Sequence, residues 1–366
     1  MSEANAPETS IDFFVKYSNT PENTPFWAEL KKICPSARIF GGVVRFHFDS
    51  RIKIVTEGYP RLICYAIRSA MRSMVLSAKR PSVAVVQSDV EVIVFSLVKA
   101  LLGRKSPRVV FSTFIYTERR SSIYRWVRHF YYNLIVLMCD TLICHSRIEV
   151  RNYGDQFARC ADKFTFVLWG GYFVGSEDVS LQKGDASWEG RPFRVFSIGR
   201  SGRDYRTFVA AITGEDVEAT IACDQQEMLQ DIGEASNLRV LRECYGDTYL
   251  DELRRCDAVV IPLAATAASI SAGQMVLVGA MAFAKPLIIT RTVTTGDYVQ
   301  DGVNGLLVDG GSPGALREAI QRLRQDRELY ERLQRGARSS YQTNHSEAAY
   351  LRNVVNVIRA AAASDT

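Results

Sequence analysis

The sequence predicts an α/β protein with two doubly wound domains, in which helices cover both faces of each parallel sheet. Short apolar runs typical of buried strands alternate with helical patterns along both halves of the chain. The composition changes at Trp169, and as far as about Arg191 the chain is rich in Gly, Ser, Asp and Glu. The length of 366 residues also suits two domains. We expect a first domain over residues 1–172, a linker over 173–190, a second domain over 191–341, and a C-terminal helix over 342–366 that returns to the first domain.

The first half contains a set of short buried strands. They are expected at Ile11–Val15, Val83–Val86, Val109–Phe111, Thr141–Cys144 and Phe164–Leu168. The clearest helix has apolar residues at Ile123, Val127, Phe130, Leu134 and Met138. This spacing is typical of a helix face that packs on a sheet.

The alternation restarts after the linker. Strands are expected at Phe193–Ile198, Ala219–Cys223, Leu238–Leu241, Ala258–Ile261, Leu287–Thr290 and Leu306–Val308. Helices are expected near Asp204–Ile212, Tyr249–Arg255, Gln274–Phe283 and Ala315–Gln325, and from about Glu347 to Ala361. Ser312 is the expected N-cap of the fourth of these helices, with Pro313 at its first position. In such sheets, ligands bind at the carboxyl ends of the strands.

Composition argues against several classes of protein. Hydrophobic residues make up 47% of the chain, as in an ordinary soluble globular protein. No apolar run is long enough for a transmembrane helix, and the polar N-terminus does not resemble a secretory signal peptide. The eight cysteines show no C-x-x-C spacing and the four histidines are scattered. We therefore expect free thiols in a reducing cytoplasm and no zinc site.

Positive charge gathers in the first half. Residues 1–180 hold 24 Lys and Arg against 16 Asp and Glu, while the remainder holds 21 against 24. A narrow stripe on one face of a predicted helix comprises Arg61, Arg68, Arg72 and Lys79. A second basic and aromatic group comprises Arg119, Arg120, Tyr124, Arg125, Trp126 and Arg128. Such groups can meet an anionic membrane or an anionic acceptor, and the alternative is the solvated face of an ordinary helix. Because no nucleic-acid motif accompanies the charge, no nucleic-acid partner is expected.

A glycine-rich segment follows the first strand of the second half and opens a helix. It reads Gly199-Arg200-Ser201-Gly202-Arg203. The glycines let the backbone approach a ligand, a helix N-terminus favours an anion, and the two arginines can donate to phosphate oxygens. The alternative is a tight turn with solvated arginines.

A second segment reads Ser271-Ala272-Gly273-Gln274. Ser271 and Gln274 have the S-x-x-Q spacing of a capping box, which predicts that a helix starts here. The helix dipole would stabilise a diphosphate at that start, and the alternative is a well-capped helix of the core. A third segment, from Thr294 to Gly305, is by its residues a loop followed by a turn.

Motifs of several other enzyme classes are absent from the sequence. It has no P-loop, no G-x-G-x-x-G dinucleotide fingerprint and no G-x-S-x-G nucleophile elbow. It also lacks a D-x-D pair of carboxylates, so neither a metal nor a cofactor is indicated.

The order of four segments resembles the donor domain of family 4 glycosyltransferases. The segments are Gly199–Asp204, Cys256–Leu263, Ser271–Pro286 and Gly296–Val308. The resemblance implies the GT-B fold, in which two Rossmann-like domains face each other across a cleft. It also implies transfer of a sugar, with retention of configuration, from a UDP- or GDP-sugar. We expect a lipid-linked or polysaccharide precursor as acceptor, bound by the first domain at the cytoplasmic face of a membrane.

The resemblance also implies roles for individual residues. The donor diphosphate would be held by Gly199, Arg200, Gly202, Arg203, Ser271, Ala272, Gly273 and Gln274. Arg203 is the expected phosphate clamp, and Arg200 is the alternative. The loop that reads the nucleotide base would comprise Cys244, Tyr245 and Gly246.

The sequence departs from the family at one motif. Family members have two glutamates eight positions apart, where this chain has Ser271 and Gly279. We expect Gln274 and Asp297 to contact the donor sugar in their place.

No catalytic base is evident from the sequence. Glu118 and His145 are candidates only because they follow strands of the first domain. Two alternatives stay open: a non-catalytic GT-B protein that binds sugar nucleotides, and a GT-B sugar-nucleotide epimerase.

Overall fold

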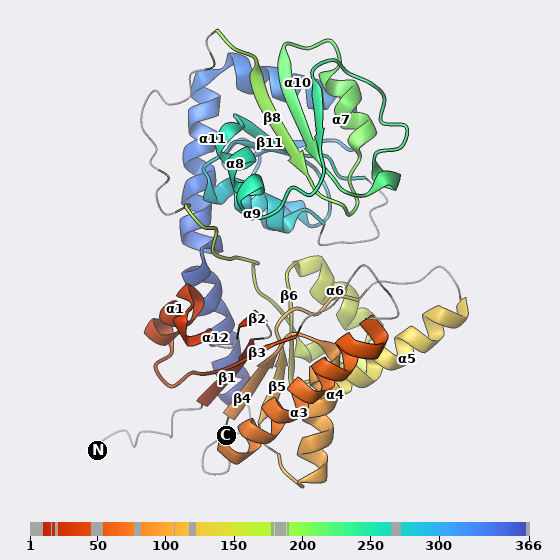
Figure 1. The fold of residues 1–366 in the computed structure, drawn as a ribbon, viewed down its shortest axis with the longest axis vertical. Coiled ribbons are helices and arrows are strands. Elements are labelled where there is room, and N and C mark those ends of the chain that lie inside the picture. Colours follow the sequence, from red (N-terminus) through yellow and green to blue (C-terminus); the bar gives the residue numbers. More distant parts are fainter. Residues whose placement is uncertain are drawn as a thin grey trace. The chain divides into compact units, whose positions relative to one another are not determined.

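The chain divides into two compact units. A computed structural model describes residues 10–15, 17–18, 21–44, 54–76, 82–105, 107–116, 122–176, 179, 188, 190–264 and 272–363. The first unit comprises Met1–Val167 together with Leu351–Thr366, and the second comprises Leu168–Tyr350 (Figure 1). The boundary expected at residue 172 lies shortly after this division, and the chain returns to the first unit at Leu351 rather than at residue 342.

The first unit is built on a sheet with the strand order β2-β3-β1-β4-β5-β6-β7. The strands are β1 Ser10–Val15, β2 Tyr17–Ser18, β3 Arg38–Val43, β4 Ser82–Val86, β5 Arg108–Phe111, β6 Thr141–Cys144 and β7 Phe164–Phe166. All neighbouring pairs are parallel except β2 and β3, so six parallel strands carry one short antiparallel edge strand. β3 and β2 are additions to the strands expected from the sequence.

Helices cover both faces of this sheet. They are α1 Pro25–Ile33, α3 Tyr59–Leu76, α4 Asp89–Leu101, α5 Ser122–Met138, α6 Arg147–Gln156 and α12 Glu347–Ala363, with short helices η1 Pro21–Asn23, η2 Ile54–Gly58 and η3 Ala158–Lys163. The connections from β3 to β4, β5 and β6 run in one direction across the sheet, so right-handed crossovers place α3, α4 and α5 on one face. Figure 1 shows these three helices side by side, with α1 and α12 on the other side of the sheet.

Helix α5 lies where the sequence predicts, but the predicted packing face is wrong. Ile123, Val127 and Phe130 of the expected stripe are exposed, whereas Ile135 and Val136 are fully buried. The sheet side of α5 is set by tyrosines instead, because Tyr131 and Tyr132 pack on the core. The Tyr131 hydroxyl also donates to Oδ2 of Asp89 at 2.8 Å. The most apolar stripe of the helix consequently faces outward.

The second unit contains six parallel strands in the order β10-β9-β8-β11-β12-β13. The strands are β8 Phe193–Ile198, β9 Val217–Ala222, β10 Leu238–Leu241, β11 Ala258–Ile261, β12 Leu287–Thr290 and β13 Leu306–Val308, and each agrees with its prediction to within two residues. This is the doubly wound order of dinucleotide-binding sheets, and the order reverses between β8 and β11. Ligands bind such sheets at the carboxyl ends of the two strands that flank the reversal.

The helices of the second unit cover two separate apolar cores, one on each face of its sheet. They are α7 Tyr205–Ile212, α8 Asp247–Arg255, α9 Gln274–Ala282, α10 Pro313–Gln325 and α11 Arg327–Ser340, with short helices η4 Gln226–Met228, η5 Thr295–Asp297 and η6 Tyr341–His345. The predicted start of α10 is confirmed, since Ala315 N donates to the Ser312 hydroxyl at 3.3 Å and Pro313 follows the cap.

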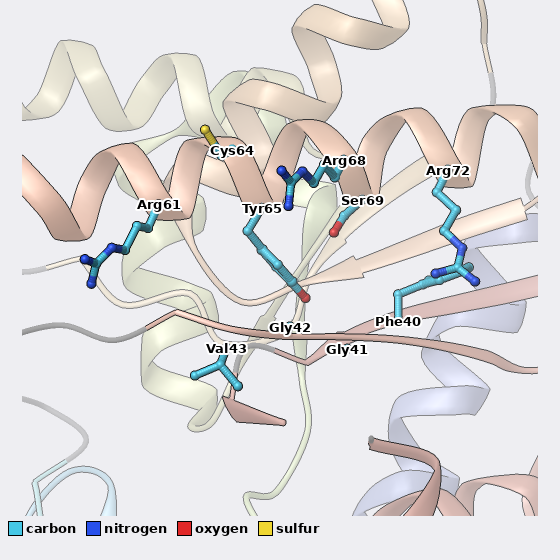
Figure 2. Close-up of a pocket in the computed structure, with 10 residues that line it drawn as sticks. All are labelled: Phe40, Gly41, Gly42, Val43, Arg61, Cys64, Tyr65, Arg68, Ser69 and Arg72. Atoms are coloured by element: carbon cyan, nitrogen blue, oxygen red, sulfur yellow. The ribbon is translucent and has the colours of Figure 1, made fainter. Parts of the chain in front are cut away.

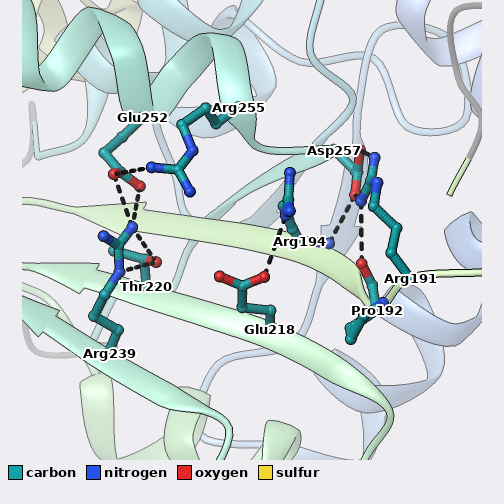
Figure 3. A network of polar contacts seen from close by, with 9 residues as sticks. All are labelled: Arg191, Pro192, Arg194, Glu218, Thr220, Arg239, Glu252, Arg255 and Asp257. Carbon is teal, nitrogen blue, oxygen red and sulfur yellow. Dashed lines mark hydrogen bonds and ion pairs between the residues drawn. The ribbon is translucent and has the colours of Figure 1, made fainter.

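Ion pairs join the amino-terminal ends of the strands in the second unit (Figure 3). Arg191 makes two bonds of 2.7 Å to the carboxylate of Asp257, which also accepts a 2.7 Å bond from the backbone N–H of Arg194. The Arg194 side chain in turn pairs with Glu218 at 3.2 Å. Because these residues lie at the starts of β8, β9 and β11, the pairs hold the edge of the sheet that is opposite the expected ligand edge.

Hydrogen bonds connect the first residues of the second unit to Tyr298 and to the short helix η6. Trp169 N donates to the Tyr298 hydroxyl at 3.0 Å, and Nδ1 of His345 lies 2.9 Å from Trp169 O. Gly171 N donates to His345 O at 3.0 Å. Burial lowers the pKa of His345, so its ring is neutral and donates its Nδ1 proton to the carbonyl.

Candidate functional site

The loop after β8 lies where the strand order of the second sheet reverses. β8 ends at Ile198, and Gly199 continues with a φ of 141°, a conformation that glycine alone adopts readily. A Cβ atom on Gly199 would lie 2.6 Å from Cζ of Arg203, so the guanidinium packs directly on the glycine backbone. The loop is joined to the end of β11, because Asp204 N donates to Pro262 O at 2.9 Å.

Arg203 is a buried cation within this loop. Its side chain is 8% exposed, and it donates to Ile198 O from Nε and Nη2 at 3.1 and 3.0 Å and to Ser201 O from Nη1 at 3.0 Å. Within the described part of the chain, no carboxylate pairs with it. Burial lowers the pKa of Arg203, yet an arginine stays protonated in proteins. The guanidinium has five N–H groups, so those that the carbonyls do not use can bind an anion.

Helix α9 begins beside Arg203. Gly273 holds the N-cap place with a left-handed φ of 92°, and Gln274 is the first helical residue. The predicted capping box is therefore wrong, because it requires Gln274 at the third helical position; Ser271 lies outside the described residues. A Cβ atom on Gly273 would lie 3.8 Å from Nη1 of Arg203 and 3.1 Å from Cγ2 of Ile261. The structure thus places the buried guanidinium next to a helix N-terminus, whose first N–H groups lack partners within the helix.

The interior of α9 is closely packed around Gly279. A Cβ atom here would clash with the Tyr249 hydroxyl and would lie 3.1 Å from Cε1 of Phe173. The Tyr249 oxygen is buried and has no hydrogen-bond partner among the described residues. A carboxylate at position 279 would therefore displace Tyr249. Ala272 and Gln274, at the start of the helix, are half-buried.

Asp224 joins the predicted base-reading loop to the loop after β8. The exposed Tyr245 donates its hydroxyl proton to Oδ2 of Asp224, and Nη1 of Arg200 lies 3.8 Å from the same oxygen. The bond from Tyr245 contributes most to keeping the pKa of Asp224 below its usual value. Cys244 is buried, so only its backbone can contact a base, and Gly246 precedes α8 with a φ of 53°.

Asp297 ends the short helix η5 in the loop that follows β12. Thr292 N donates to the Thr295 hydroxyl at 2.8 Å, and that hydroxyl donates to Thr292 O at 3.1 Å. Asp297 N donates to Thr294 O at 3.1 Å, and its side chain is half-buried. The loop is thus fixed at the same edge of the sheet as the loops after β8 and β11.

Of the two catalytic candidates, only His145 falls within the described residues, at the carboxyl end of β6; Glu118 lies outside them. The ring of His145 is buried, with Nδ1 2.9 Å from Val167 O and Nε2 3.3 Å from the Thr113 hydroxyl. Burial lowers the pKa of His145, so the ring is neutral and its Nδ1 proton is donated to the carbonyl. These contacts hold the ends of neighbouring strands together, and a catalytic role for His145 stays a prediction.

Three of the four arginines and lysines in the predicted stripe line a groove of about 460 Å³ in the first unit. Figure 2 shows Arg61, Arg68 and Arg72 along the side of α3 that faces β3. Tyr65 reaches from the helix to the strand between them. Lys79 lies outside the described residues.

The charged side chains in the described lining of the groove are all cationic. None of the residues that line it is acidic. The Arg72 guanidinium lies 4.9 Å from the centroid of the Phe40 ring, and Arg61 pairs with Glu57 at 3.1 Å. Gly42 forms part of its wall because a Cβ atom there would lie 2.6 Å from the Tyr65 ring. The three arginines thus lie around one groove rather than over a flat face.

The described residues offer neither a metal site nor a membrane-spanning helix. No group of three or more His, Cys, Asp or Glu side chains in that part of the chain could hold a metal ion. Likewise, no described helix is long and apolar enough to cross a bilayer.

Comparison with known proteins finds a likeness to glycosyltransferases within the second unit. Residues 205–326 match the family model described as "Glycosyl transferases group 1". An uncharacterised glycosyltransferase of Methanocaldococcus jannaschii is 37% identical over 95 residues, which span 26% of this chain and only 25% of that protein.

Solved structures share the fold over almost the whole chain. Anabaena HepE, in complex with UDP and glucose, matches 96% of this chain and 100% of its own with a TM-score of 0.61 and 12% identity. WaaG, a glycosyltransferase involved in lipopolysaccharide biosynthesis, matches 96% of this chain and 99% of its own with a TM-score of 0.55 and 12% identity. With two doubly wound parallel sheets and a likeness to these structures over almost the whole chain, the protein has the GT-B fold, and residues 205–326 of its second unit are similar to the group 1 glycosyltransferases.

Proposed function

We propose that the protein transfers a sugar, with retention of configuration, from a UDP- or GDP-sugar to a lipid-linked or polysaccharide precursor. One observation carries the donor half of this proposal. Arg203 is a buried cation with no carboxylate partner in the described residues, and it lies beside the N-terminus of α9 at the reversal of strand order. A buried charge is costly unless an opposite charge approaches it, and a donor diphosphate supplies that charge. The HepE complex with UDP supports a uridine nucleotide.

The same groups account for the departure of the leaving group. Negative charge develops on the nucleoside diphosphate as the bond between the anomeric carbon and its phosphate oxygen breaks. Arg203 and the N–H groups at the start of α9 lie in fixed positions before the reaction, so they stabilise that charge without reorganisation. The backbone of Gly199, Gly202, Ala272 and Gly273 lets the diphosphate approach closely, and Arg200 lies within reach as a second cation.

The other donor contacts follow from the surrounding loops. Gln274, at the first position of α9, and Asp297, after β12, contact the sugar. The backbone of Cys244 to Gly246 and the exposed ring of Tyr245 contact the base. Asp224 orients Tyr245 and Arg200 through its bonds to both.

We assign the anionic part of the acceptor to the groove between α3 and β3. Arg61, Arg68 and Arg72 line it, and none of its described lining residues is acidic. A phosphate or carboxylate of a lipid-linked or polysaccharide precursor would receive charge-assisted bonds there. The likeness of WaaG, a protein of lipopolysaccharide biosynthesis, agrees with such an acceptor. The reaction would take place at the cytoplasmic face of a membrane.

A product assay tests the whole proposal. The purified protein is incubated with each of a panel of UDP- and GDP-sugars and a membrane extract, and both transferred sugar and released nucleoside diphosphate are measured. We expect one donor to give both products in equal amounts. An isomerised donor without an acceptor product would assign an epimerase, and tight donor binding without any product would assign a non-catalytic binding protein.

Two variants test the acceptor groove in the same assay. Arg68→Ala and Arg72→Ala should raise the KM for the acceptor while the Kd for the nucleotide is unchanged. An unchanged acceptor KM in both variants would remove the groove from the proposal and leave the donor site intact.

A further inference from the structure

Two segments of the chain pack in direct contact near the ends of the second unit. This unit comprises Leu168–Tyr350, so the chain passes to and from the first unit at its two ends. Gly171 N donates to His345 O at 3.0 Å. A Cβ atom on Gly170 would lie only 2.5 Å from the same oxygen, so the lack of a side chain lets the two segments meet. We call residues 169–171 together with His345 the junction.

Tyr298 binds the junction through its hydroxyl and its ring. Trp169 N donates to the Tyr298 hydroxyl at 3.0 Å, and Nδ1 of His345 donates to Trp169 O at 2.9 Å. The rings of Tyr298 and His345 are stacked, with centroids 5.3 Å apart. Both residues are buried. One pair of stacked rings therefore holds both backbone polar groups of Trp169.

Tyr298 also belongs to the loop after β12, whose proposed sugar contact is Asp297. The loop has an open side, because Gly296 is exposed and a Cβ atom placed there would have no neighbour within 4 Å. Its buried side is fixed at Tyr298, whose N–H donates to Thr295 O at 3.1 Å and whose carbonyl accepts from Nδ2 of Asn304 at 3.1 Å. Asp297 lies between the open side and this fixed residue.

We propose that Tyr298 is a positioning residue for the donor sugar, and that its bond to Trp169 N couples the junction to the placement of Asp297. A ring without a hydroxyl would fill the same space, and a buried hydroxyl is costly unless it is hydrogen-bonded. The bond to the junction is therefore a specific use of tyrosine here. A site contact is held precisely when the residues that support it are themselves fixed. The inference deepens the proposed contact between Asp297 and the sugar and rests on that proposed function.

Tyr298→Phe tests the coupling, because it removes the hydroxyl and keeps the ring on His345. Calorimetry gives the Kd for UDP-glucose and GDP-mannose and for UDP and GDP, and the pair that the parent binds is compared. We expect the Kd for the sugar nucleotide to rise about three- to tenfold, as for the loss of one hydrogen bond. The Kd for the nucleoside diphosphate should change by less than about twofold, because Arg203 and α9 hold the diphosphate.

A double-mutant cycle shows whether Tyr298 acts through Asp297. In an Asp297→Ala background no carboxylate remains to be positioned, so Tyr298→Phe should change the Kd for the sugar nucleotide by less than about twofold. Tyr341→Phe is the matched control. The Tyr341 hydroxyl donates to Gly171 O at 3.0 Å, so it also binds the junction but lies outside the donor loop. It should lower the urea midpoint about as much as Tyr298→Phe and leave the Kd for the sugar nucleotide unchanged.

Several outcomes would overturn the inference. They are parental sugar-nucleotide binding in a folded Tyr298→Phe variant, additive losses in the cycle, an equal loss in Tyr341→Phe, and an equal loss of nucleoside diphosphate affinity. Parental binding in Asp297→Ala would refute the sugar contact and the coupling together. A parent that binds the sugar nucleotide but transfers no sugar would refute the proposed transfer, while the cycle in Kd would still decide the role of Tyr298. A parent that binds no sugar nucleotide would overturn both.

Discussion

Replacement of Arg203 by alanine is the most direct test of the donor site. The guanidinium forms three bonds to the carbonyls of Ile198 and Ser201 and keeps its remaining N–H groups for a ligand. Loss of one hydrogen bond to a charged group costs about 1.5–3 kcal/mol, which corresponds to a Kd about 10- to 150-fold higher for the nucleoside diphosphate. Loss of the bonds within the loop leaves a backbone acceptor without its donor and should lower the free energy of unfolding by about 1–3 kcal/mol.

Titration calorimetry with UDP and with GDP measures the first effect, and urea denaturation measures the second. Arg206→Ala is the matched control, because Arg206 is an exposed arginine three positions away, and it bonds to Asp231 O at 3.2 Å. Asp326→Ala controls for stability alone, since it removes the N-cap of α11 and costs about 1 kcal/mol far from the loop. Neither control should change nucleotide affinity.

A second variant displaces the Arg203 guanidinium without removing it. Gly199→Ala leaves Arg203 in place but adds a Cβ atom at a φ of 141° and only 2.6 Å from Cζ of the arginine. The displaced guanidinium should again bind UDP and GDP more weakly. If Arg203→Ala is folded and binds both nucleotides like the parent, then Arg203 does not bind the diphosphate and the reasoning fails.

Three other outcomes follow from single features of the structure. Tyr249→Phe removes a buried hydroxyl that has no described partner and should raise the free energy of unfolding by about 1–3 kcal/mol in urea; a decrease would mean that the hydroxyl is bonded. Burial lowers the pKa of His145 and His345, so below about pH 6.5 the unfolded chain binds protons that the folded chain does not. Stability is therefore complete above that pH and decreases as the pH falls, by at most about 1.4 kcal/mol per pH unit and histidine, and the decrease should be smaller in His345→Asn. Gln274→Ala and Asp297→Ala should each lower turnover at least about tenfold, or 1.4 kcal/mol of barrier; parental rates in both would exclude the sugar contacts.

The strands of the second unit are predictable because each is a short run made mostly of Val, Ile, Leu, Phe and Ala. The signal is weaker in strand β3, where only three of the six residues are apolar and two are the glycines Gly41 and Gly42. Its place depends on a distant partner: Arg38 Nε donates to Oδ1 of Asp12 at 2.6 Å, and Ser73 donates to the other oxygen at the same distance. No local pattern contains such a tertiary contact.

The S-x-x-E/Q capping pattern predicts some helix starts of this chain correctly and one incorrectly. The S-x-x-Q spacing before α9 does not form a capping box, because the left-handed Gly273 begins the helix. Two S-x-x-E patterns elsewhere in the sequence do form caps. They run from Ser88 to Glu91 at α4 and from Ser146 to Glu149 at α6. Those two helices could therefore have been found from the sequence by the same rule.

The candidate site is predictable only in part. The order of loops after β8, β11 and β12 follows from the motifs, and the structure brings Arg203 next to Gly273. Asp224 and Tyr249 could not be anticipated, because their contacts join segments that are distant in the sequence. The period of α5 likewise defines an apolar stripe but does not say whether that stripe packs on the sheet or faces outward.

The division of the chain has a consequence for its synthesis. The second unit is one continuous segment, Leu168–Tyr350, whereas the first unit needs Leu351–Ala363, where Arg108 donates to the carbonyl of Ala361. On the ribosome, domains commonly fold as they emerge, beginning with the N-terminal one. Here the second unit can complete its fold first. The first unit lacks helix α12, which covers one face of its sheet, until the end of the chain has been made. The first unit is therefore the part of the nascent chain that stays incomplete for longest.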